Sequence, residues 1–247
     1  MDTHKVVHKY GNGKVRIVLF QGWGLPPFLW SKTLQFFDLN KFEIMTIDLG
    51  KIDLEQNCDL NSFCNIINDI LTRNSFYPDF LFGHSMGATI MISLLLNFSV
   101  KPKGIVFIDS GLKPSVRNSE LMPLINRNSG NIGTYRTILR SFFRNIDFND
   151  LEKITDEFMQ YNIDVLKCQL KAISRYDFTS TANFLTLPAL IIFGEYDKNR
   201  NFEELQDVHI RIKNSTIVVF KNSAHCPMFE EPLRFADIVQ KFIDEIS

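Results

Sequence analysis

Long apolar runs are absent from this sequence of 247 residues. The most apolar stretch, residues 88–96, is far shorter than the ~20 residues that a membrane-spanning helix needs. The chain begins with polar residues, and no apolar segment of signal-peptide length follows them. We therefore expect a cytoplasmic protein that does not enter a membrane.

An excess of basic residues is also missing, because 27 lysines and arginines stand against 28 acidic residues, a formal net charge of −1. Proteins that bind nucleic acid or anionic membranes over much of their surface carry a clear basic excess. The balance excludes a general affinity of this kind, so we expect no nucleic acid and no membrane as partners. A local basic patch stays compatible with it.

Cysteine is scarce as well. The four cysteines, at positions 58, 64, 168 and 226, form neither a CxxC pair nor the spacing of a metal site. In a cytoplasmic protein, thiols are expected to stay reduced. We therefore expect four free thiols and no bound metal.

What is present is a globular composition, 45% hydrophobic and 22% charged, in a length that suits one or two domains. Over the first 110 residues, short β-type runs alternate with segments of helical periodicity. Strands that alternate with helices predict a parallel sheet with crossover helices. The expected elements are strands at 15–20, 42–47, 80–82 and 104–108, helices at 61–73 and 88–98, and a hairpin at Gly11-Asn12-Gly13.

This alternation stops near residue 112, and a helical pattern continues to residue 186 before strands return. The expected elements are helices at 135–143 and 151–161, strands at 188–193 and 216–220, and a last helix at 233–246. We predict an α/β core made of residues 1–112 and 187–247, interrupted by a helical lid, residues 113–186.

The sharpest local signal is Gly83-His84-Ser85-Met86-Gly87, which stands between an expected strand and an expected helix. This is the G-x-S-x-G pattern of a nucleophile elbow in the context that the elbow requires. The glycines permit a tight turn that exposes the Ser85 hydroxyl, and the next helix directs backbone N–H groups at a developing oxyanion. A turn with an incidental serine is the alternative, but this placement favours Ser85 as the nucleophile.

A serine nucleophile needs a base, and the base needs an orienting acid. Asp197 and His225 each follow one of the two late strands, so their side chains are expected at the same edge of the sheet. The chain order Ser85, Asp197, His225 is that of the α/β-hydrolase triad. We therefore predict these three residues to be catalytic.

The triad assignment has alternatives. An aspartate after a strand is often only a turn former, and Asp109, also just past a strand, is the second candidate for the acid, with Glu195 the third. The remaining histidines are expected to be non-catalytic because none has a comparable position: His4, His8, His84 and His209.

A second oxyanion donor is expected from the loop after an early strand. That loop is Gln21-Gly22-Trp23-Gly24, so the backbone N–H groups of Trp23 and Met86 are predicted to form the oxyanion hole. The Trp23 indole is a candidate wall of the substrate pocket, and plain packing is the alternative role.

These motifs resemble the α/β-hydrolase superfamily across both parts of the core. Within it, Gly22-Trp23-Gly24, the elbow at 83–87 and Ala224-His225-Cys226-Pro227 resemble the biotin-pathway esterases that cleave pimeloyl-acyl-carrier-protein methyl ester. The resemblance implies the α/β-hydrolase fold, with a mostly parallel central sheet, flanking helices and a helical lid, and no metal or organic cofactor. The sequence departs from this family at two places. Gln21 stands where the family usually has histidine, which affects the support of the loop that follows. Asp48-Leu49-Gly50 lacks the longer loop that is usual after this strand, which affects the rim of the pocket.

The expected lid carries a local excess of basic residues. Between Arg117 and Arg144 there are five arginines and one acidic residue, a net charge of +4. Arg136, Arg140 and Arg144 recur every four residues, so one helix is predicted to carry them as a stripe, and arginine suits phosphate recognition. In the resembling esterases, lid arginines engage the phosphopantetheine phosphate of an acidic acyl carrier protein, which implies substrate-binding roles for Arg136 and Arg140. A solvated helix face is the alternative.

We therefore expect a monomeric serine carboxylesterase that works through an acyl-enzyme. Its first candidate substrate is an acyl ester carried on an acyl carrier protein, pimeloyl-acyl-carrier-protein methyl ester in biotin biosynthesis. Phe142 and Phe143 lie beside the arginines and are expected mainly in the core, with Phe143 as a candidate contact of the acyl chain. The alternatives are a general short-chain carboxylesterase or thioesterase, a menaquinone-pathway lyase, and a binding protein without catalysis.

Overall fold

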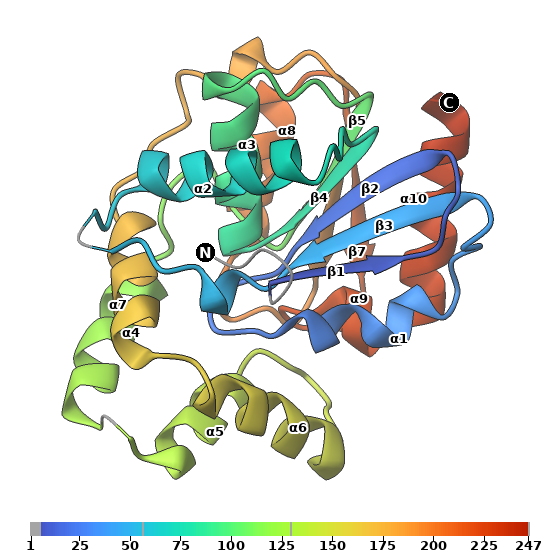
Figure 1. Cartoon of the computed structure of the whole chain (residues 1–247). Coiled ribbons are helices and arrows are strands. Elements are labelled where there is room, and N and C mark those ends of the chain that lie inside the picture. Colours follow the sequence, from blue (N-terminus) through green and yellow to red (C-terminus); the bar gives the residue numbers. More distant parts are fainter. Residues whose placement is uncertain (1–5, 56, 129, 247) are drawn as a thin grey trace.

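The computed structural model describes residues 6–55, 57–128 and 130–246. Within these residues, one seven-stranded sheet has the order β1-β3-β2-β4-β5-β6-β7 (Figure 1). The strands are β1 (Val7–Tyr10), β2 (Val15–Phe20), β3 (Phe42–Ile47), β4 (Phe80–His84), β5 (Gly104–Ile108), β6 (Ala189–Gly194) and β7 (Ser215–Phe220). Every neighbouring pair is parallel except β1 with β3. The prediction of a mostly parallel sheet is confirmed.

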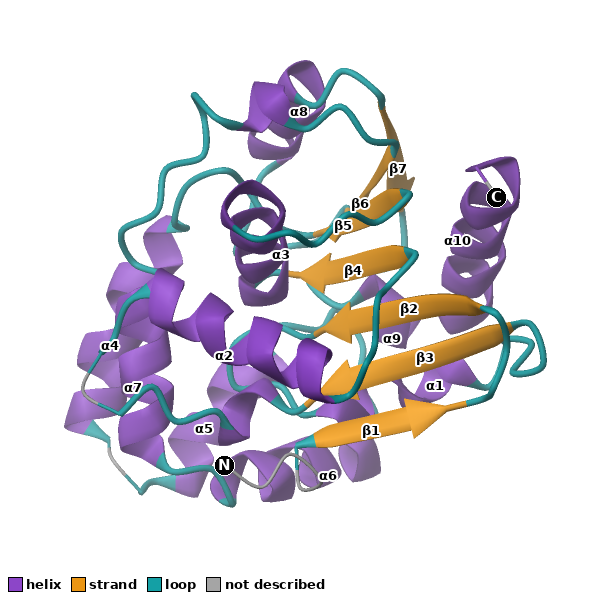
Figure 2. Cartoon of the chain, turned by 45° about the horizontal axis from the view of Figure 1, so that its top comes forward, coloured by secondary structure: helices purple, strands orange, loops and turns teal. Residues whose placement is uncertain are grey.

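Helices cover both faces of the sheet (Figure 2). One face carries α2 (Leu60–Arg73), α3 (Met86–Asn97) and α8 (Phe202–Arg211), and the other carries α1 (Ser31–Leu34), α9 (Pro227–Glu230) and α10 (Pro232–Ile246). In the described residues, 3₁₀ turns lie in the connections at η2 (Pro27–Trp30), η3 (Leu49–Lys51) and η4 (Ala182–Phe184). Because both faces are covered, β4 and β5 are buried along their whole length, which explains their uninterrupted apolar sequences.

The expected hairpin at Gly11-Asn12-Gly13 is wrong. β1 lies beside β3, with Val7 opposite Ile47, so β3 separates β1 from β2. Gly11 has a φ of +71°, and a Cβ at this position would lie 2.3 Å from the carbonyl oxygen of Phe42. Glycine is needed here because the chain passes closely over the start of β3. That contact joins distant segments, so the local pattern could not indicate it.

Four helices lie over the edge at which the parallel strands end (Figure 2). They are α4 (Val116–Arg127), α5 (Ile132–Arg140), α6 (Phe148–Met159) and α7 (Ile163–Ala172), all within the segment expected to form the lid. Each begins at a polar side chain that accepts a hydrogen bond from a first-turn backbone N–H, and these caps are Ser115, Asn131, Asp147 and Asn162. We call these four helices the lid.

The expectation of four free thiols is also wrong. Cys58 and Cys168 form a disulfide, with Cα atoms 4.8 Å apart. They are separated by 110 residues in sequence, so only the folded chain brings the segment before α2 against α7. The disulfide ties the lid to the core, while Cys64 and Cys226 are free and buried.

Among the described helices, none has an apolar stretch of the length that a membrane span requires.

Candidate active site

The chain turns sharply at Ser85, between the end of β4 and the start of α3. Ser85 has φ 51° and ψ −116°, a conformation that costs energy for any residue with a side chain. A Cβ on Gly83 would lie 2.5 Å from the Cα of Ala88, and one on Gly87 would lie 2.4 Å from the carbonyl oxygen of Phe20. Both glycines are therefore required by close backbone packing, and the turn leaves Ser85 at the edge where the strands end.

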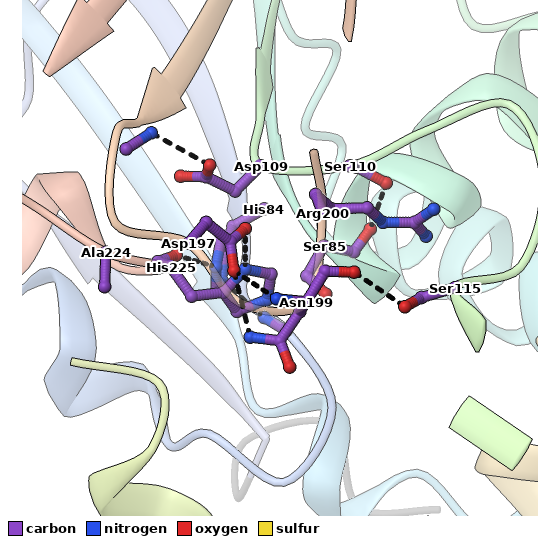
Figure 3. A network of polar contacts seen from close by, with 12 residues as sticks. His84, Ser85, Asp109, Ser110, Ser115, Asp197, Asn199, Arg200, Ala224 and His225 are labelled. Carbon is purple, nitrogen blue, oxygen red and sulfur yellow. Dashed lines mark hydrogen bonds and ion pairs between the residues drawn. The ribbon is translucent and has the colours of Figure 1, made fainter. Parts of the chain in front are cut away.

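Asp197 and His225 meet at the same edge. The Nδ1 of His225 donates to Oδ2 of Asp197 over 2.7 Å, while Oδ1 accepts from the backbone N–H and side-chain amide of Asn199, at 2.7 and 3.1 Å (Figure 3). With its proton on Nδ1, the imidazole keeps Nε2 available to accept a proton. The two loops can approach only because residue 194 is glycine, since a Cβ there would lie 1.7 Å from the carbonyl oxygen of Ala224.

Ser85 and His225 line one small cavity together with Trp23. The structure therefore brings the three predicted triad residues together, with the serine and the base on a shared cavity and the acid behind the base. This is the arrangement of a nucleophile, a general base and an orienting carboxylate.

The loop after β2 contributes Trp23 to this cavity. The Trp23 indole Nε1 donates to the carbonyl oxygen of Leu166 in α7 over 2.8 Å, so the lid helps to fix the loop. Met86, which is the first residue of α3, is 2% exposed beside Ser85. Gln21 is fully buried, and neither polar atom of its side chain has a hydrogen-bond partner within the described residues, so the support of this loop comes from elsewhere.

That support is His84, which no sequence motif marked as functional. Its Nδ1 accepts from the backbone N–H of Gly22 at 3.1 Å, so Nε2 carries the proton and donates to the carbonyl oxygen of His225 at 2.7 Å. The two imidazole rings lie 4.8 Å apart. Burial and the neighbouring His225 hold the pKa of His84 well below its usual value, so it is neutral. His84 is a positioning residue that links the Trp23 loop to the base.

Asp109, the second candidate for the acid, lies behind Asp197. Its Oδ1 accepts from the backbone N–H of Gly194 at 3.0 Å, and its buried Oδ2 meets no N–H donor within the described residues. Burial and the adjacent Asp197 charge raise the pKa of Asp109 well above its usual value. The raised pKa favours the protonated form of Asp109 next to the carboxylate of Asp197. His225 pairs with Asp197 and not with Asp109.

Asp109, Asp197 and His225 are also close enough to share a metal ion, with candidate ligand atoms within 4.8 Å of one another. Within the described parts of the chain, no other such group of three occurs. The same atoms of Asp197 and His225 already form their hydrogen bond. The arrangement thus serves the orientation of the base.

The remaining predicted residues lie on or near the lid. Arg136 forms an ion pair with Glu152 of α6, in which Nη2 lies 2.6 Å from Oε2. Arg140 is exposed, and its Nη1 donates to the carbonyl oxygen of Phe143 at 2.8 Å. Arg144 falls beyond the end of α5, so the predicted single stripe of three arginines is wrong.

The aromatic residues after α5 are placed differently from one another. Phe143, expected mainly in the core and a candidate contact of the acyl chain, is buried and packs against Phe229 with ring centroids 5.5 Å apart. Phe142 instead lines the cavity of Ser85, and its ring lies 5.6 Å from that of His225. Glu195 is exposed, as expected for a residue outside the triad.

His8 and His209 lie outside this site. His209 has its Nδ1 2.8 Å from the Ser215 hydroxyl, and His8 lies in the edge strand β1. His4 lies outside the described residues.

Residues 17–238 match the model of a protein family described as "Alpha/beta hydrolase family". The chain belongs to the alpha/beta hydrolase family. It is similar to a pimeloyl-[acyl-carrier protein] methyl ester esterase from Legionella pneumophila, with 23% identity over 98% of this chain and 100% of that protein. A proline iminopeptidase from Saccharolobus solfataricus is 25% identical over 67% of this chain and 62% of its own length.

The fold agrees with this assignment. An esterase from Exiguobacterium antarcticum superposes with a TM-score of 0.85 at 16% identity, covering 96% of this chain and 94% of the other. The predicted α/β-hydrolase fold and membership of that superfamily are confirmed, and the protein is a hydrolase of this family.

Proposed function

We propose that this hydrolase is a serine carboxylesterase and that its substrate is pimeloyl-[acyl-carrier protein] methyl ester. The observation that carries the reaction class is the hydrogen bond between Asp197 and His225 at the cavity of Ser85. The substrate is supported by the relatives of that name that match nearly the whole chain, from Legionella pneumophila and Vibrio parahaemolyticus.

The first half-reaction transfers the acyl group to the enzyme. Nε2 of His225 takes the proton of the Ser85 hydroxyl while its oxygen attacks the ester carbonyl carbon. Asp197 stabilises the imidazolium, and the backbone N–H groups of Trp23 and Met86 bind the oxyanion. The C–O bond to the methoxy group then breaks, and His225 returns the proton so that methanol leaves.

The second half-reaction releases the acid. Water gives a proton to His225 and attacks the carbonyl carbon of the acyl-enzyme, through a second oxyanion at the same amides. Collapse breaks the bond to Ser85, which recovers its proton from His225. One ester and one water become one carboxylic acid and methanol.

The lid is proposed to meet the carrier protein through its basic residues. Arg140 is the first candidate for the phosphate of the carrier, because it is exposed and its hydrogen bonds go to backbone carbonyl groups, although its charge also acts on Glu230. Arg136 is the second, although it shares its charge with Glu152. Electrostatic attraction of this kind weakens as salt is added.

The decisive experiment supplies purified protein with the carrier-bound methyl ester and follows loss of the methyl group by mass spectrometry. We expect demethylation by the wild type and a loss of at least ~10³-fold in Ser85→Ala, because removing the nucleophile leaves only the oxyanion hole and substrate binding. Arg140→Ala is expected to raise KM more for the carrier-bound ester than for a free methyl ester. Turnover of free esters without demethylation of the carrier would identify a general carboxylesterase instead.

Covalent labelling separates the non-enzymatic alternative. A fluorophosphonate probe reacts with an activated serine, so we expect it to label wild type at Ser85 and not Ser85→Ala. An unlabelled wild-type protein would favour a binding protein.

A further inference from the structure

The cavity at Ser85 is too small for the substrate that the reaction requires. It has a volume of about 30 Å³, whereas sites for small molecules usually span about 300–1,000 Å³. A water-sized group needs roughly 10–15 Å³ of such space, so two heavy atoms fit beside Ser85. A methoxy group has two heavy atoms, but an acyl chain needs another place.

A larger cavity adjoins the small one. It has a volume of about 560 Å³ and lies between α4 and α5 of the lid. Leu121, Phe142 and Asn199 line both cavities and therefore form the partition between them. We call this larger space the lid cavity.

The walls of the lid cavity combine apolar, hydroxyl-bearing and charged side chains. Leu121, Leu124 and Ile138 supply apolar surface, and Thr134 and Thr137 of α5 supply hydroxyl groups. Arg117 and Glu120 of α4 add one charge of each sign. Such walls suit a chain of methylene groups that continues into a part able to form hydrogen bonds. A purely polar ligand would leave the leucine and isoleucine side chains without apolar contact.

We propose that the lid cavity binds the acyl chain of the ester and that the small cavity at Ser85 receives the alkoxy group. The proposal rests on the ester hydrolysis proposed above, but not on the carrier protein. It orients the substrate with its carbonyl group at the partition, next to Ser85 and His225. It also selects esters of a small alcohol joined to an extended acid.

The position of the Phe142 ring determines whether the lid cavity is connected to the cavity at Ser85. The backbone of Phe142 is held, because its carbonyl oxygen accepts from the backbone N–H of His225 at 2.9 Å. Its ring is buried beside that of His225, and a change of its side-chain rotamer is the motion that would open the partition without moving the base. The bound chain then occupies the position that the ring leaves.

The test fills the lid cavity and compares it with a matched surface site. Thr137→Trp places an indole in the lid cavity, whereas Thr72→Trp places one in a separate cavity of about 560 Å³ lined by α2 and the end of α3. The two threonines are alike, because each is exposed and donates its hydroxyl to the carbonyl oxygen four residues earlier. Thermal unfolding of both variants checks that the fold is kept.

The readout is chain-length preference, taken as kcat/KM for monomethyl suberate divided by kcat/KM for methyl acetate. We expect Thr137→Trp to lower this ratio at least tenfold and Thr72→Trp to leave it within twofold of wild type. Phe142→Ala, which widens the partition, is expected to raise it. An unchanged ratio in Thr137→Trp, including an equal loss on both esters, would overturn the proposal.

Binding to Ser85→Ala tests the cavity without catalysis. We expect calorimetry to detect binding of monomethyl suberate to Ser85→Ala and a loss of at least tenfold in affinity when Thr137→Trp is added. If the wild type hydrolyses neither ester, but Thr137→Trp still weakens binding to Ser85→Ala at least tenfold, the esterase proposal is refuted. The proposal that the lid cavity binds the acyl chain is then supported. Equal affinity in Ser85→Ala with and without Thr137→Trp would refute binding in the lid cavity and leave the esterase proposal standing.

Discussion

His84 at the edge of the sheet and the two arginines of α5 in the lid are held in different ways. At the sheet edge, His84 is bonded to residues 62 and 141 positions away in sequence. In the lid, Arg140 donates to carbonyl groups three and four residues further along, and Arg136 pairs with a residue 16 positions away. Bonds between distant segments fix the catalytic geometry, whereas the lid arginines are held by near neighbours.

This difference explains why sequence spacing predicted the positions of the triad residues better than those of the lid arginines. Parallel strands end at one edge, so residues that follow them must converge whatever their separation in sequence. A helix surface imposes no such convergence, and a charged side chain there takes whichever partner lies nearby.

The first prediction concerns which aspartate acts on the base. Asp197→Asn is expected to lower kcat about 10³–10⁴-fold, because asparagine cannot stabilise the imidazolium and favours the wrong tautomer of His225. Asp109→Asn is the matched control, since its amide still accepts from Gly194 and donates to Asp197, and it should cost less than tenfold. Steady-state kinetics on a soluble ester decides between them. The reverse ranking would make Asp109 the catalytic acid.

The second prediction concerns His84. His84→Phe removes the acceptor for Gly22 and the donor to His225, so the Trp23 loop loses its support. We expect kcat to fall about 10–100-fold with little change in KM, because an oxyanion donor acts mainly in the transition state. His84→Gln, which keeps one acceptor and one donor, should recover part of the loss. A higher KM at unchanged kcat would show that His84 serves substrate binding instead.

The third prediction concerns the dependence of stability on pH. The pKa of Asp109 is raised in the folded protein, so the folded state keeps a proton that the unfolded chain releases above about pH 4. This group's contribution to stability is therefore complete at lower pH and is lost as pH rises toward its folded pKa. Asp109→Asn has no such proton to lose.

Chemical denaturation at several pH values measures this effect. Between pH 5 and 8, the free energy of unfolding of Asp109→Asn should rise relative to wild type by up to about 1.4 kcal/mol per pH unit, the value for one proton. A difference that stays constant over this range would mean that Asp109 is ionised in the folded protein.

The fourth and smallest effect is expected in the lid. Arg136 and Glu152 have side chains that are 37% and 28% exposed, and ion pairs of this kind contribute about 0–1 kcal/mol. A double-mutant cycle with Arg136→Ala and Glu152→Ala, followed by chemical denaturation, should give a coupling energy below about 1 kcal/mol. A coupling above 2 kcal/mol would show that the lid is held as firmly as the sheet edge.

Sequence reasoning located most of the fold because its signals are local. The apolar runs of the central strands, the helical spacing of α2 and α10 and the glycines around Ser85 each follow from neighbouring residues. The ends of elements were less accurate, since α5 ends at Arg140 and leaves Phe142 and Phe143 in a turn. That turn is what gives Phe142 its place beside His225.

Features that join distant segments were missed. The pairing of β1 with β3, the disulfide between Cys58 and Cys168 and the two hydrogen bonds of His84 depend on chain separations that no window of sequence covers. The role of Asp109 was also open, because two aspartates that follow strands look alike until their distances to His225 are known.

The balanced charge, the lack of a long apolar run, the alternating α/β pattern and the order of Ser85, Asp197 and His225 can all be read from the sequence. The pairing of Asp197 with His225, the support of both halves of the site by His84 and the position of the lid cavity beside Ser85 follow only from the folded chain. The physical reason is the separation along the chain over which each effect acts. Periodicity and turn chemistry act between neighbours, whereas hydrogen-bond partners, burial and cavities are set by segments that meet only when the chain has folded.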